Sequence, residues 1–308
     1  MTSRTKEQGA AEPAGNNGFT LISNEKLLQL YTTMLKCRMI EERARALFKQ
    51  GGAAGNGFLS PGQEAAVVAV AIDLLPKDVI APSHRDFMLH FIEGEPLRTI
   101  FGRLLARPDR PVEGIASQLD IATKAAQSNK KKKNGKIAVA FCGDSSASLS
   151  SLPSAFDLAS AQRLPLLFIF QSNRSVFQND RSIQPASLAR RSQAPDSAAL
   201  VRVLPWITVD GNDVVAVYRV ATEAVTQARK GNGPTLIECR PYSPQSRAGT
   251  APGKSRAPDR VQRSNPHDPI LNMENYLTGK GIFSPKIKRE AVTAFSSELD
   301  AATKSLNY

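Results

Sequence analysis

Two short polar segments, each of which ends an apolar run and is called a polar stop, are the positions in this sequence best suited to chemistry. In IAVAFCGDSSAS the apolar run leads to Asp144, which Ser145 and Ser146 follow, and in LPLLFIFQSN the run ends shortly before Asn173. A carboxylate and an amide oxygen are hard ligands. With a main-chain carbonyl and the oxygens of a diphosphate they complete the octahedral shell that Mg²⁺ prefers. These residues therefore predict a magnesium site.

Both stops are expected at one edge of a parallel sheet. Ligands of open α/β sheets bind at the carboxyl ends of the strands, and a right-handed crossover makes two successive strands parallel. The two ends would be about 5 Å apart in adjacent strands, or about 10 Å apart with one strand between them. Ser145 and Ser146 would then open the crossover helix, whose backbone N–H groups receive phosphate. The alternative that Asp144 is only a helix N-cap stays open.

The rest of the chain alternates between strand and helix patterns, as βαβ units require. Strands are expected within 78–87 and at 136–142, 164–171, 206–213 and 234–242, and helices at 24–50, 58–76, 96–108, 154–163, 214–233 and 284–306. This order predicts an α/β fold with a mostly parallel central sheet and helices on both faces.

One of the expected helices carries clear start signals. Ser60 is suited to the N-cap, Pro61 to the first helical position, and Gln63 completes a capping box. The residues that follow are apolar nearly all round, which indicates a buried helix. The basic, low-complexity stretch AAQSNKKKKNG at 125–135 is expected to form a loop instead.

Length and composition indicate a globular protein. The chain has 308 residues, of which 41% are hydrophobic, enough for a full core. Residues 1–20, rich in Gly, Ala and Asn, predict a disordered arm, and 21–308 predict a single domain. No run approaches the roughly 18 apolar residues that cross a bilayer, so no membrane association is expected. The three cysteines lack zinc spacing and indicate reduced thiols in a cytoplasmic protein.

The charge is strongly basic, with a net value of +12. The excess is concentrated in 98–136 and 240–263, two loop-like stretches that lack a platform of interleaved aromatic residues on which bases could stack. We expect this basicity to serve an anionic ligand, a partner protein or solubility rather than nucleic acid.

The two polar stops and their surroundings resemble a known family. The segment GDSSAS…LPLLFIFQSN is similar to the thiamine-diphosphate motif in the alpha subunit of 2-oxo-acid dehydrogenases of the pyruvate, branched-chain and acetoin type. That motif begins Gly-Asp-Gly and ends Asn-Asn. Similarity continues in LLQLYTTMLKCRMIEERARALFKQG, LSPGQEAAVVAVAIDLLPKDVIAPSHRDF, VDGNDVVAVYRVATEAVTQARKGNGPTLIECRPY and the tripeptide DPI. The resemblance covers about Leu27 to Leu299 and implies the thiamine-diphosphate-binding fold.

The resemblance also implies site residues. Asp144 and Asn173 correspond to the side-chain ligands of Mg²⁺, and the main-chain carbonyl of Ser175 to a third protein ligand. His84 and Arg85 correspond to a pair that contacts the diphosphate of the cofactor.

Two further positions follow from the same resemblance. Ser145 and Ser146 stand where the family has a glycine and a small residue beside the diphosphate. Gln63 and Glu64 belong to a helix start whose role is expected to be structural.

The family also implies an activity and partners. Its members carry out oxidative decarboxylation of a 2-oxo acid with thiamine diphosphate and Mg²⁺ and pass the acyl group to lipoamide. The partners implied are a beta-type subunit, in an alpha2beta2 heterotetramer, and a lipoyl-bearing acyltransferase core; the beta chain carries the acid that activates the cofactor. Neither nucleic acid nor a membrane is implied.

Several positions depart from the family pattern. Ser145 replaces the glycine after the acid, Ser172 replaces the first Asn of the closing pair, and Phe87 stands where the family has His. A loop with two histidines that serve the cofactor and the decarboxylation is here PYSPQSRAGT, without any His. These departures leave open an alternative in which the chain is a diverged, non-catalytic paralogue that acts as a binding or scaffold subunit.

Overall fold

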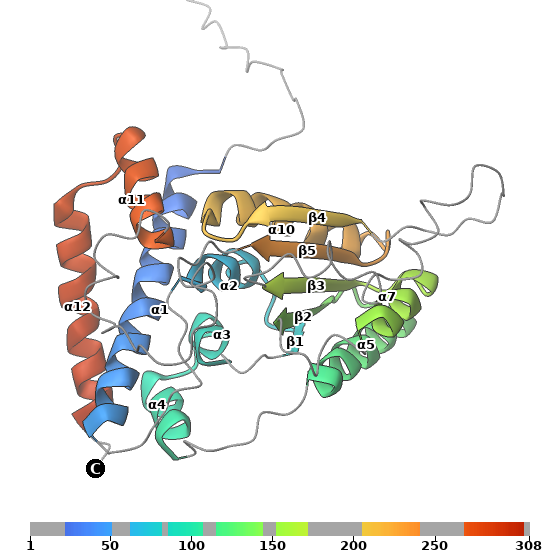
Figure 1. Ribbon diagram of the computed structural model, residues 1–308, viewed down its shortest axis with the longest axis horizontal. Helices are drawn as coiled ribbons and strands as arrows, with labels where there is room; N and C mark the ends of the chain where they lie inside the picture. Colours follow the sequence, from blue (N-terminus) through green and yellow to red (C-terminus); the bar gives the residue numbers. More distant parts are fainter. Residues whose placement is uncertain are drawn as a thin grey trace, which may run out of the picture.

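The computed structural model describes residues 22–50, 62–81, 86–106, 115–143, 152–171, 205–240 and 268–304. At its centre is a five-stranded sheet in which every neighbouring pair is parallel, in the order β1-β2-β3-β5-β4 (Figure 1). The strands are β1 (Val79–Ala81), β2 (Ala138–Gly143), β3 (Leu166–Gln171), β4 (Trp206–Asp210) and β5 (Thr235–Arg240). The prediction of an α/β fold with a parallel central sheet is confirmed.

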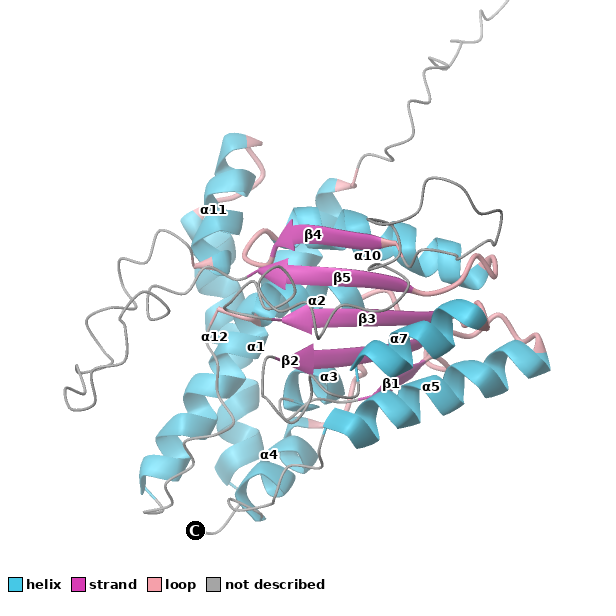
Figure 2. Ribbon diagram, turned by 45° about the vertical axis from the view of Figure 1, so that its right-hand side comes forward, coloured by secondary structure: helices cyan, strands magenta, loops and turns pink. Residues whose placement is uncertain are grey.

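Helices cover both faces of the sheet (Figure 2). On one face lie α1 (Asn24–Gln50), α2 (Glu64–Ala71), α3 (Asp86–Ile92), α4 (Leu97–Ala106), α10 (Val214–Arg229), α11 (Pro269–Gly279) and α12 (Pro285–Lys304). On the other lie α5 (Ile115–Lys132) and α7 (Leu152–Ala161). Successive side chains of a strand point to opposite faces. In β3, accordingly, Leu167 and Ile169 pack against the first group and Leu166, Phe168 and Phe170 against the second.

Two crossovers have the same hand. The β2–α7–β3 connection runs one way along the sheet with its helix on one face, and β4–α10–β5 runs the other way with its helix on the opposite face. Reversing both direction and face preserves handedness, as the right-handed rule requires.

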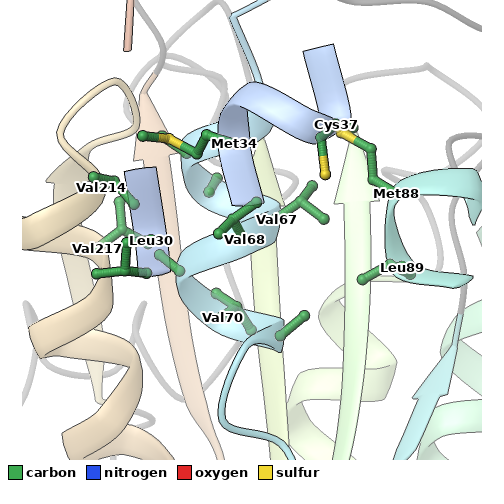
Figure 3. Packing of buried hydrophobic residues seen from close by; sticks show 14 of the residues in the cluster. Leu30, Met34, Cys37, Val67, Val68, Val70, Met88, Leu89, Val214 and Val217 are labelled. Carbon is green, nitrogen blue, oxygen red and sulfur yellow. The ribbon is translucent and has the colours of Figure 1, made fainter. Parts of the chain in front are cut away.

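The helix α2 is the centre of the larger core. All of its residues are buried. Figure 3 shows Leu30 and Met34 of α1 and Val217 of α10 around the α2 residues Val67 and Val68. The expectation of a helix buried on all sides is confirmed.

Its start was predicted wrongly, because α2 begins at Glu64 with Gln63 as N-cap, and the Gln63 side chain makes no capping hydrogen bond. Gly62 has a φ of +98°, which a right-handed helix cannot contain. The proposed cap at Ser60 lies outside the described residues.

Three helices were not predicted from the sequence. The stretch expected as a loop after residue 125 continues α5 to Lys132. The buried face of α5 uses Leu119, Ala122 and Ala126 at helical spacing, and small alanines make a weak hydrophobic signal. The other two missed helices are α3 and α11.

In α11, Asp268 caps the helix and Pro269 occupies its first turn, the usual start signals. No helix in the described part of the chain is both long and apolar enough to cross a bilayer. The predicted arm at 1–20 falls outside the described residues.

Candidate functional site

The strands that lead to the predicted site lie side by side. Gly143, the last residue of β2, pairs with Gln171, the last residue of β3, so no strand separates the two polar stops. Of the two spacings expected from the sequence, the shorter one of about 5 Å between strand ends applies. The next strand on the other side of β2 is β1, which ends at Ala81.

The predicted site residues follow directly after these strand ends. Asp144, Ser145 and Ser146 follow β2, Asn173 and Ser175 follow β3, and His84 and Arg85 follow β1; all of them lie outside the described residues. Their roles as metal and diphosphate ligands stay predictions. Within the described residues, no three His, Cys, Asp or Glu side chains gather in a way that would hold a metal.

The carboxyl ends of β1 and β2 lie next to each other at this edge. After β1 the chain continues to α3 and α4 on the face of α1 and α2 and then to α5 on the face of α7, and α5 leads into β2. Ligands of open α/β sheets bind outside the carboxyl ends of the strands. Arg85 and Asp144 are predicted on the two sides of the boundary between β1 and β2.

A buried donor without a partner lies at the same edge. Gln171 is 9% exposed, and no described group accepts a hydrogen bond from its Nε2. Its face of the sheet is that of Ile169, and its ladder neighbours are Gly143, which has no side chain, and Cys239. Buried polar groups without partners are rare and recur at functional sites. A free donor here is suited to an anionic ligand.

Burial keeps the neighbouring thiol neutral. Burial raises the pKa of Cys239 to about 12, and the charge of Glu238 adds to the effect. The Cys239 side chain therefore adds no negative charge to the edge that would receive a diphosphate.

Beside this edge, an ion-pair network fixes the start of α2. Arg38 of α1 donates to both oxygens of Glu64 and, across 2.8 Å, to Oδ2 of Asp268. Glu64 also accepts from the backbone N–H of Gly62 at 2.8 Å. The other oxygen of Asp268 caps α11 through the N–H of Ile270 at 2.8 Å. The network joins α1, α2 and α11, and it confirms a structural part for Glu64.

The network changes the acid–base behaviour of its members. The carboxylates of Glu64 and Asp268 raise the pKa of Arg38, against the opposing effect of its burial. Burial raises the pKa of the Cys37 thiol, and the nearby carboxylates of Glu64 and Glu41 raise it further. Cys37 is therefore a neutral side chain of the core.

A second buried carboxylate lies near the end of β5. Glu238 is fully buried and accepts hydrogen bonds from Trp206 at 3.2 Å, Thr208 at 3.1 Å and Arg240 at 2.9 Å. These residues share the sheet face that α5 and α7 cover elsewhere. This cluster was not predicted from the sequence, although a charged residue inside the apolar run TLIECR could have indicated a buried ion pair.

Of the three histidines, His90 is described. It lies in the last turn of α3, and its Nδ1 is 3.2 Å from Glu95 and 3.8 Å from Glu93. It is part of a cluster with these two carboxylates.

Comparisons with known proteins agree with the fold described above. Residues 31–307 match the model of a family described as dehydrogenase E1 component. A pyruvate dehydrogenase E1 component subunit alpha of Staphylococcus epidermidis is 30% identical, with 92% of this chain and 78% of the relative covered. Its counterpart in Staphylococcus aureus strain Mu50 is 29% identical over the same shares. The chain belongs to the dehydrogenase E1 component family, as a diverged member of its alpha type.

Proposed function

We propose that the chain is the alpha-type subunit of a 2-oxo-acid dehydrogenase complex. It takes part in the oxidative decarboxylation of a 2-oxo acid with thiamine diphosphate and Mg²⁺, and in transfer of the acyl group to lipoamide. The observation that carries the proposal is the pairing of Gly143 with Gln171, because it makes the two predicted ligand segments leave from adjacent strand ends. The relatives that are pyruvate dehydrogenase subunits make pyruvate the first 2-oxo acid to test.

The residues near this edge fit an anionic cofactor that is bound through a metal. Asp144, Asn173 and the carbonyl of Ser175 would hold Mg²⁺, which neutralises diphosphate charge that a lone carboxylate would repel. The buried Nε2 of Gln171 offers a further donor. Bound thiamine diphosphate supplies carbanion stabilisation, the chemistry that a decarboxylation needs.

Other residues would orient the diphosphate. Arg85, with His84 beside it, would supply positive charge from the end of β1. The backbone N–H groups at Ser145 and Ser146 would receive phosphate where the chain turns toward α7. Partners complete this arrangement: a beta-type subunit, in an alpha2beta2 assembly, supplies the acid that activates the cofactor, and a lipoyl-bearing acyltransferase core receives the acyl group.

Calorimetric titration of the full chain with thiamine diphosphate tests the proposal, with and without Mg²⁺ and with and without a beta-type subunit from the same genome. We expect Mg²⁺-dependent binding, weakened at least tenfold by Asp144→Asn, because even outer-shell changes at metal sites cost about 10- to 100-fold. Asp120→Asn is the matched control, since Asp120 is an exposed residue of α5 that pairs with Lys124. Folded protein that binds no cofactor under any of these conditions would refute the proposal.

A second candidate is a non-catalytic paralogue that acts as a binding or scaffold subunit. The observation that favours it is the loop PYSPQSRAGT, which offers no histidine for proton transfer after β5. General acid–base catalysis needs a titratable side chain within hydrogen-bond reach. A reconstituted complex that binds the cofactor but releases no CO₂ from a panel of 2-oxo acids would favour this candidate, whereas turnover would exclude it.

A further inference from the structure

The edge of the sheet opposite the candidate site is uniformly basic. We call it the amino-terminal rim and define it as the last turn of α5 with the four loops that lead into β1, β2, β3 and β5: residues 130–137, 75–78, 162–165 and 230–234. Its cationic residues are Lys77, Lys130, Lys131, Lys132, Lys133, Lys136, Arg163 and Lys230. Lys136 is half-buried and the others are exposed.

The rim is one continuous surface because its loops precede neighbouring strands. The order β1-β2-β3-β5 places the loops in sequence along the edge, at the spacing of about 4.8 Å between strands. Direct contacts join them. The N–H of Ile137 donates to Asp78 at 3.0 Å, the N–H of Ala138 donates to Pro165 at 2.9 Å, and Arg229 donates to the carbonyl of Gly135 at 2.9 Å.

Nothing in the described part of the chain neutralises this charge. None of the rim cations forms an ion pair with a described residue, and the one carboxylate within the rim, Asp78, is fully buried and pairs with Arg229 at 2.5 Å. The charge of the chain as a whole points the same way. With 40 Lys and Arg against 28 Asp and Glu, the whole chain is basic as well.

Helix stability explains only part of these cations. The lysines in the last turn of α5, Arg163 after α7 and Lys230 at the C-cap of α10 favour the dipoles of those helices, but Lys77 and Lys136 lie in loops. Moreover, Lys133 and Arg163 have φ values of +49° and +46°, whereas the equivalent position after α10 is Gly231, with a φ of +78°. Glycine is the usual residue there, and a side chain in this conformation costs about 1 kcal/mol. Two cations thus occupy positions where glycine would be less strained.

We propose that the amino-terminal rim is a docking surface for an acidic segment of a partner protein. Seven of its eight cations are lysines, which act as flexible point charges, whereas planar forked recognition of phosphates favours arginine. A strand of this sheet spans about 20 Å. A partner on the rim therefore leaves the opposite edge, where the cofactor site is proposed, free to work.

The test measures binding of a fluorescently labelled oligoglutamate peptide to the full chain by anisotropy. The rim variant combines Lys133→Gln, Lys136→Gln, Arg163→Gln and Lys230→Gln. The control variant, Lys280→Gln with Lys286→Gln, Arg289→Gln and Lys304→Gln, removes the same number and types of charge from α12 and the end of α11. Figure 1 shows these helices at the side of the molecule away from the strand starts.

We expect the wild type to bind the peptide with an affinity that falls as salt rises from about 50 to about 200 mM. The rim variant should bind at least tenfold more weakly, and the control variant within twofold of wild type. Equal losses in both variants would show a general effect of net charge and overturn the proposal. Tighter binding of a DNA duplex than of oligoglutamate at equal anion concentration would also overturn it, in favour of nucleic acid.

Discussion

Single buried polar side chains decide which substitutions this protein tolerates, and the outcome depends on whether each side chain has hydrogen-bond partners. Gln171, Glu64 and Glu238 are all withdrawn from water, but only the two glutamates have a full set of donors around them. Removing the partner of a buried carboxylate lowers the free energy of unfolding, whereas a buried amide without a partner already lowers it in the protein without ligand. Substitutions at these residues should therefore change stability in opposite directions.

Replacement of Gln171 by Met should stabilise the protein without ligand. Loss of a buried donor that has no partner removes a cost of about 1–3 kcal/mol, and Met has a similar unbranched shape. Urea unfolding should show a gain of about 1 kcal/mol. Gln127→Met is the control, because Gln127 already donates to Gln162 at 2.9 Å, and it should show no gain. A clear loss of stability in Gln171→Met would contradict the expectation.

Replacement of Arg38 by Met should destabilise the fold by about 3–5 kcal/mol, because Glu64 would be left as a buried charge without its partner. The double variant with Glu64→Met should recover much of this loss. Arg43→Met, which breaks the exposed pair with Asp300, should cost at most about 1 kcal/mol. Similar losses for Arg38 and Arg43, measured by urea unfolding, would show that burial of the network does not matter.

The buried thiols predict a dependence of stability on alkaline pH. Burial raises the pKa of Cys142 and of Cys239 to about 12, above the ordinary value near 9. The unfolded chain therefore loses these protons between about pH 9 and 12 while the folded protein keeps them, so the free energy of unfolding falls as pH rises. The slope is up to about 1.4 kcal/mol per pH unit for each thiol. Cys142→Ala should make the decline measurably shallower, and an unchanged slope would contradict this origin.

At the scale of elements, the ends of helices show how local geometry and surface charge compete. The helices α5, α7 and α10 are each followed by a residue with positive φ, namely Lys133, Arg163 and Gly231. Only the last of these is a residue that adopts such a conformation without strain.

Arg163→Gly should therefore raise the free energy of unfolding by about 1 kcal/mol, while Gly231→Ala should lower it by a similar amount. Gly231→Ala adds no clash, since a Cβ at Gly231 would meet nothing within 4 Å. Thermal unfolding of the two variants isolates the backbone effect. If Arg163→Gly also weakens oligoglutamate binding, the Arg163 side chain both lowers the stability of the fold and contributes to docking.

At the scale of the whole molecule, the sequence predicted the strands well because their apolar runs are long and lie between turn residues. It failed where the signal was small or misleading. The face of α5 is built on Ala122 and Ala126, and its end on consecutive lysines that look like a loop. It also failed for the pairings of Arg38 and Glu238, because their partners are distant in sequence and only the folded chain brings them together.

The candidate site was also predicted only in part. That the two polar stops should meet at one edge followed from the rule for parallel strands, and the β2–β3 pairing confirms that the strands leading to them are adjacent. Gln171 could not be recognised from sequence, because a strand-final Gln looks like any polar residue until its burial and its missing partner are known.

The complete burial of α2 has a consequence for how the protein acquires its binding edge. An isolated helix of eight residues does not form in water, so α2 exists only when its neighbours enclose it. Those neighbours, α1 and α10, come from the beginning of the chain and from beyond residue 213. A nascent or proteolysed polypeptide that lacks α10 should therefore leave the α2 amides open to deuterium exchange. The edge at which the cofactor site is proposed is thus complete only after synthesis of the third quarter of the protein.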